Sequence, residues 1–107
     1  MARRKVGNFM LEKLTHDDFF NRLHQKFLVH HDDGTLEAEL IECRKLASPG
    51  GPDVQRQPFA LIFRGPRQPV LAQQIYKLEG GAMGPLEIFI VPMGPDSVGM
   101  RYEAIFS

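Results

Sequence analysis

A chain of 107 residues, 43% of them hydrophobic, is long enough to bury one core and too short to favour two domains. Its 13 basic residues balance 13 acidic ones, which argues against a dedicated binder of nucleic acid or of an anionic membrane surface. Cys43 is the only cysteine, so a disulfide within the chain is excluded; a buried side chain in a reducing compartment is expected instead.

The first 13 residues form a basic segment that we expect to be flexible, with a single β-rich domain over residues 14–107. The start of the chain, MARRK, has the positive charge of a signal peptide, but polar residues interrupt the apolar stretch that such a signal requires. No segment approaches the roughly 20 apolar residues of a membrane-spanning helix. The expected location is therefore the cytoplasm.

A short helix is predicted over residues 16–25. Thr15 is typical of a helix N-cap, and two aspartates follow it in the first turn, where the helix dipole favours negative charge. So short a helix is marginal in isolation and must pack on the rest of the domain. Its apolar stripe would consist of Phe19, Phe20 and Leu23.

The pattern then changes from helical to alternating. Asp33-Gly34 indicates a two-residue hairpin turn of type I′, in which both central residues need a positive φ. With that turn, Val29 would lie opposite Ala38. The apolar positions slip after residue 40, which predicts a bulge near residues 40–42.

Four further strands are predicted over residues 59–63, 71–79, 86–91 and 100–106, and glycine- and proline-rich loops over 47–57 and 92–99. The strands at 59–63 and 86–91 are apolar on both faces. The predicted fold is mainly β (α+β): a small six-stranded antiparallel barrel or curled sheet with one short N-terminal helix.

The histidines do not indicate a metal site. His30 and His31 are adjacent, so they point to opposite faces of a strand, and His16 and His24 are too far apart for a helical pair of ligands. His30 is more simply explained as a surface partner of a glutamate, Glu37, across the hairpin. No catalytic constellation is evident either, and the sequence predicts no metal, no cofactor and no enzyme.

The most distinctive polar motif is Arg64-Gly65-Pro66, at the end of an apolar strand. The structural interpretation is that the guanidinium pairs with a carboxylate on a neighbouring strand, such as Glu103. The functional interpretation is a contact with a ligand or partner. The first is favoured, because arginines at strand ends commonly form such pairs.

Five segments stand out as a set: LTHDDF at residues 14–19, FALIFRGP at 59–66, QIYKL at 74–78, LEIFIVP at 86–92 and MRYEAIF at 100–106. With these segments, the chain resembles an uncharacterised family of small bacterial domains over about residues 14–107. The resemblance implies no catalytic residues, and it implies an assembly role beside collar-like proteins of phage tails. The candidate interaction or structural residues in these segments are Arg64, Tyr76, Arg101, Tyr102 and Glu103.

The predicted function is a non-catalytic protein-binding or assembly module, whose partner is another protein or a second copy of the chain. Strands that are apolar on both faces leave an association surface wherever the helix does not cover them. Complete coverage would instead give a monomer. The alternative function is a small-molecule binder or small enzyme that uses the mouth of the barrel, which predicts a deep pocket with convergent polar groups.

Overall fold

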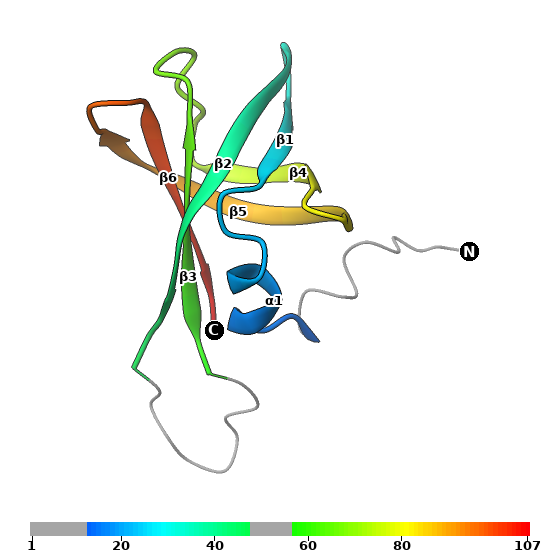
Figure 1. The fold of residues 1–107 in the computed structure, drawn as a ribbon. Coiled ribbons are helices and arrows are strands. Elements are labelled where there is room, and N and C mark those ends of the chain that lie inside the picture. Colours follow the sequence, from blue (N-terminus) through cyan, green and yellow to red (C-terminus); the bar gives the residue numbers. More distant parts are fainter. Residues whose placement is uncertain (1–12, 48–56) are drawn as a thin grey trace.

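Six antiparallel strands close into a barrel beside one short helix in the computed structural model, which describes residues 13–47 and 57–107 (Figure 1). The order around the barrel is β1-β2-β3-β6-β5-β4, and β4 pairs with β1 to complete the circle. The predicted fold is therefore confirmed. The basic segment, apart from Lys13, and most of the loop at 47–57 lie outside the described residues. The elements are α1 (His16–Phe20), β1 (Lys26–His31), β2 (Gly34–Lys45), β3 (Phe59–Gly65), β4 (Gln74–Gly80), β5 (Met83–Pro95) and β6 (Met100–Phe106).

The helix α1 is shorter than predicted. Its start is as expected, because the Thr15 N–H donates to Asp18 Oδ2 over 2.9 Å. It ends at Phe20 rather than at residue 25, since the following turn leads to His24 with a φ of 71°, which no α-helix allows. The His24 N–H donates to Leu40 O of β2 over 2.7 Å. A contact with the sheet thus replaces the predicted last helical turn.

The β1–β2 hairpin has the predicted faces but a different register. Val29 lies opposite Leu36, not Ala38, because the two turn residues are Asp32 and Asp33. Neither has a positive φ, so the turn is not of type I′. The shift of two residues preserves the side of the sheet on which every side chain lies. The bulge is confirmed between residues 40 and 42.

The strand β5 is much longer than predicted, whereas β6 has the predicted bounds. The first part of β5 pairs with β4 and the last part with β6, with a bulge between Pro92 and Gly94. The regular hydrogen-bond pattern is interrupted at a bulge, so Pro92, which suggested a loop in the sequence, is tolerated there. The predicted loop at 92–99 is thereby reduced to the turn at 96–99. β3 runs on to Gly65, and β4 starts only at Gln74.

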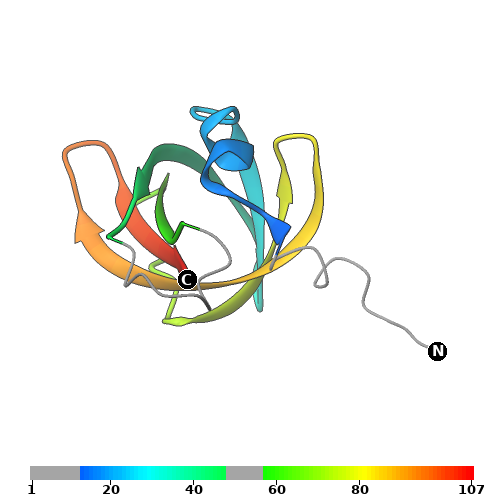
Figure 2. The same cartoon turned by 90° about the horizontal axis from the view of Figure 1, so that it is seen from below.

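The barrel interior is filled mainly by aromatic and branched apolar side chains. Figure 2 shows the strands curling around this interior, seen from below. Phe59 and Phe106 stack with their ring centroids 4.8 Å apart, and Phe19 of α1 packs against both rings. Phe19 is fully buried, but Phe20 is 50% exposed, so its place in the predicted apolar stripe is wrong. The helix therefore covers one end of the interior with a single phenylalanine.

Replacing Phe19 with alanine should lower the free energy of unfolding by about 3 kcal/mol, because it leaves a cavity among aromatic rings. Urea denaturation followed by circular dichroism measures the loss. The matched control is Phe20→Ala in the same helix, which should cost no more than about 1 kcal/mol. Equal losses in the two variants would contradict the role given to Phe19.

Candidate functional site

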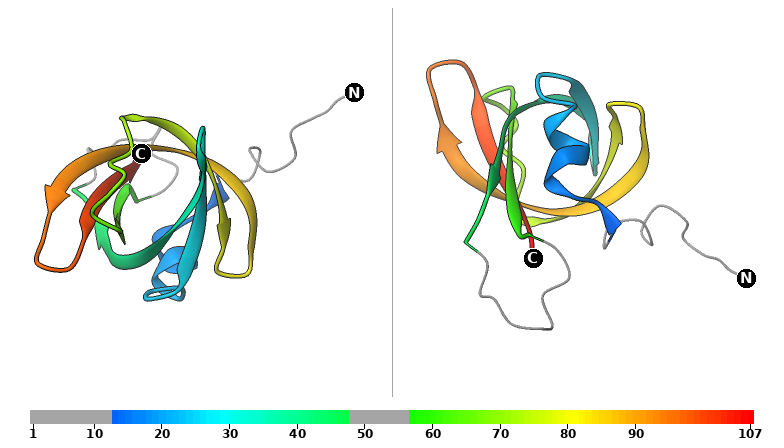
Figure 3. Two further views of the ribbon diagram at one scale, coloured as in Figure 1. Left: turned by 90° about the horizontal axis from the view of Figure 1, so that it is seen from above. Right: turned by 60° about the horizontal axis from the view of Figure 1, so that its bottom comes forward.

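The antiparallel order gathers three connections at one end of the barrel, which we call the turn end. They are the β1–β2 turn at 32–33, the β3–β4 connection at 66–73 and the β5–β6 turn at 96–99. Figures 1 and 3 show them away from α1, which lies near the last residues of β6. Two of the predicted site residues, Arg64 and Arg101, come from the strand ends here, and the tyrosines reach the same end through their hydroxyls.

The two tyrosines hold the β3–β4 connection against the barrel. The Tyr102 hydroxyl accepts a hydrogen bond from the Leu71 N–H over 2.9 Å, and the Tyr76 hydroxyl donates to Ala72 O over 2.8 Å. Both tyrosines and Leu71 are buried. The pKa of Tyr76 is raised. Burial is the largest cause, and the negative charges of the nearby Tyr102 and Asp32 side chains add to it. The hydroxyls are thus used to close this end of the interior.

Arg64 pairs with an aspartate of the β5–β6 turn, and the predicted pair with Glu103 is wrong. Its Nη1 lies 3.0 Å from Asp96 Oδ2. In the β3–β6 register Arg64 faces Arg101, while Glu103 lies two residues further along, opposite Ile62. Glu103 instead lies 3.9 Å from a guanidinium nitrogen of Arg44 on β2. The Arg64 guanidinium thus pairs with a carboxylate, but with Asp96 of the β5–β6 turn and not with Glu103.

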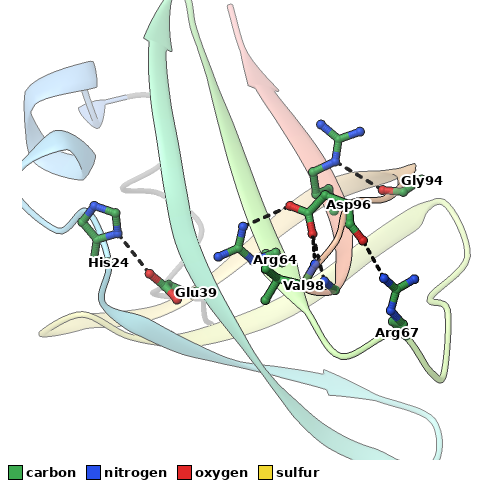
Figure 4. Close-up of polar contacts among 9 residues, drawn as sticks. His24, Glu39, Arg64, Arg67, Gly94, Asp96 and Val98 are labelled. Carbon is green, nitrogen blue, oxygen red and sulfur yellow. Dashed lines mark hydrogen bonds and ion pairs between the residues drawn. The ribbon is translucent and has the colours of Figure 1, made fainter.

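Asp96 organises the β5–β6 turn. Its Oδ1 accepts hydrogen bonds from the Val98 and Gly99 N–H groups over 2.8 and 2.9 Å (Figure 4). These backbone bonds, and to a lesser degree Arg64, lower the pKa of the carboxyl to about 2. Gly99 is needed here, because a Cβ at this position would lie 2.2 Å from Gly65 O.

A second arginine contacts the same turn, and a third contacts the end of β5 that leads into it. Arg67 Nη2 donates to the Asp96 carbonyl over 2.8 Å, and Arg101 Nε donates to Gly94 O over 3.4 Å. We call Arg64, Arg67 and Arg101 the arginine rim. Within the described residues, Asp96 is the one carboxylate that forms an ion pair with any of them.

Sequence reasoning missed Arg67 and Asp96. A usable signal was present, since aspartate at the first position and glycine at the fourth, here Asp96 and Gly99, are typical of a type I turn.

The cysteine and the histidines lie outside the turn end. His16 and Cys43 contact each other, because the Cys43 thiol donates to His16 O over 3.4 Å and His16 Nε2 lies 3.1 Å from Cys43 O. Cys43 is buried as expected, and burial, with a contribution from Asp17, raises the pKa of its thiol to about 11. His30 contacts Glu79 on β4 rather than Glu37, because it faces Thr35 in the actual register. No group of three or more metal-ligating side chains occurs in residues 13–47 and 57–107.

A second candidate surface lies on the outer wall of the barrel. Ile75 of β4 lies directly opposite Phe89 of β5, and these side chains are 61% and 49% exposed. Val91, two residues along β5 on the same face, is partly exposed. We call these three residues the apolar wall. The outer face of β5 is thus uncovered, whereas both faces of the first five residues of β3 are buried.

Residues 14–106 match the model of a family described as a domain of unknown function (DUF6916), and the chain belongs to this family. The expected membership of an uncharacterised family is confirmed. No curated protein and no solved structure shows a significant match to the chain. Within the described residues, no helix is long and apolar enough to cross a membrane.

The Asp96 carboxyl should titrate near pH 2 rather than near 3.8, as measured by NMR of its side-chain carbon. Because the folded-state pKa is lowered, its contribution to stability is present above about pH 4 and is lost as the pH falls through about 2. Arg64→Gln should leave this pKa below its ordinary value, since the backbone N–H groups are the larger cause. An ordinary pKa in the wild type would contradict the assignment.

Proposed function

We propose that this domain is a non-catalytic protein-binding or assembly module, and that the apolar wall is its binding surface. The observation that carries the proposal is the direct pairing of Ile75 and Phe89 on the outside of a closed barrel, 61% and 49% exposed. An exposed aromatic beside a branched aliphatic side chain is the kind of anchor that dominates binding energy at protein interfaces.

The surroundings of the apolar wall favour a protein partner. The next outward-facing pair along β4 and β5 is Lys77 opposite Glu87, which places charged groups beside the apolar pair. An apolar centre with a polar border is the usual anatomy of a protein interface. Since β4 already pairs with β1, and β5 with both β4 and β6, a partner is expected to pack on this face rather than extend the sheet.

The mouth of the barrel is less suited to binding. The interior is occupied by apolar side chains, and the hydroxyls of Tyr76 and Tyr102 bond to the connection that covers this end. A small molecule would have to displace Leu71 and break these bonds. This packing supports a function on the outer surface over a ligand or reaction in the mouth.

The remaining parts of the proposal rest on the family resemblance and on composition. An association with collar-like proteins of phage tails, and a bacterial source, follow from the family resemblance alone. A cytoplasmic location and the absence of nucleic-acid and membrane partners follow from the balanced charge and the single cysteine. The partner is another protein or a second copy of this chain.

Affinity capture from the native host after mild cross-linking tests the proposal. Wild-type protein should capture at least one partner reproducibly, and Ile75→Lys/Phe89→Lys should lose it. The loss of one hot-spot side chain costs about 2 kcal/mol, or roughly 30-fold in affinity.

The matched control is Leu28→Lys, the same change at a 42% exposed apolar residue of β1 outside the apolar wall, which should retain the partner. Capture that is equal in all three proteins would contradict the proposal.

A further inference from the structure

The turn end carries opposite charges on its two sides. Asp32 and Asp33 form the β1–β2 turn, both exposed, and no ion pair within the described residues engages either of them. The arginine rim lies around the β5–β6 turn. Arg64 pairs with the Asp96 carboxylate, whereas Arg67 and Arg101 donate to the backbone carbonyls of Asp96 and Gly94. The first turn therefore has two unbalanced negative charges, and the second has two unbalanced positive charges.

These two turns lie across the barrel from each other. In the circular order, one strand separates the two hairpins on each side: β3 on one side and β4 on the other. Figure 1 shows the tips of the β1–β2 and β5–β6 hairpins well apart above the barrel. The turn end is thus dipolar, with its acidic and basic parts at opposite edges.

A dipolar end of this kind is complementary to itself. A two-fold axis across the turn end, perpendicular to the line joining the two turns, brings the acidic turn of one copy onto the basic turn of the other. The same rotation forms the second contact, as an isologous interface requires. Val70 lies in the β3–β4 connection and Val98 in the β5–β6 turn; they are 55% and 67% exposed and would lose water in the contact.

We infer that two copies of this chain pair head to head through their turn ends, with the aspartates of each β1–β2 turn against the arginine rim of the other. A foreign acidic segment fits less well, because Asp32 and Asp33 on the same end would repel it. This surface is separate from the apolar wall, so the inference goes beyond the proposed function.

Charge reversal tests the pairing. Asp32→Lys/Asp33→Lys makes both turns basic, and Arg67→Glu/Arg101→Glu makes the basic side acidic, while the Arg64–Asp96 pair stays intact in both. By sedimentation equilibrium, the wild type should be dimeric and each variant alone monomeric. An equimolar mixture of the two variants should form a heterodimer, and Lys45→Glu at the opposite end of β2 should behave as the wild type.

Salt gives a second readout. The dimer should weaken tenfold or more between about 0.05 M and about 0.5 M salt, because interactions between exposed charges are screened over that range. Circular dichroism checks that each variant is folded. A monomeric wild type, a dimer insensitive to salt, or a mixture that stays monomeric would overturn the inference. A dimer that is lost in Ile75→Lys/Phe89→Lys but kept in the charge variants would also overturn the inference. That result would assign self-association to the apolar wall.

Discussion

Closure of the sheet between β1 and β4 is the constraint on which the rest of the structure depends. Four residue pairs form this ladder, beginning with Phe27 opposite Gly80. The strands approach so closely that a Cβ on Gly80 would lie 2.5 Å from Lys26 O, and its φ of +141° also favours glycine. Closure creates the enclosed interior and arranges the three connections of the turn end in a ring around its mouth. The turn end and the apolar wall both follow from this one seam.

A closed and filled barrel leaves little polar chemistry inside. The tyrosine hydroxyls at the turn end bond to the backbone of the β3–β4 connection, and Asp96 is used by its own turn and by Arg64. The groups without a local partner lie on the outer surface. They are the exposed apolar side chains of Ile75 and Phe89 and the unbalanced charges of the turn end. These features support the proposal that the molecule associates through its surfaces, by apolar contact on the apolar wall and by charge at the turn end.

Alternation and turn residues were enough to predict the fold class, because side chains that alternate across a strand reveal its buried face. The bounds of β6 were predicted correctly for this reason. Features that depend on contacts between residues distant in sequence could not be predicted in this way. The bond from His24 to Leu40 ends the helical segment early, and β5 continues past Pro92 because β6 supplies a second partner. Four of the candidate site residues, two strand-end arginines and two tyrosines, do lie at one end of the barrel. The pair between Arg64 and Asp96 could not be predicted, because it depends on the β3–β6 register.

The central claim is that the barrel stays closed and functions through its outer surface. Native-state hydrogen exchange of the amides in the β1–β4 ladder tests it most directly. If the seam is an integral part of the fold, these amides exchange only through global unfolding, with the same free energy of opening as the β3–β6 ladder. A markedly lower opening free energy for β1 and β4 alone would show that the barrel opens at this seam. The interior would then be accessible, in contradiction to the account.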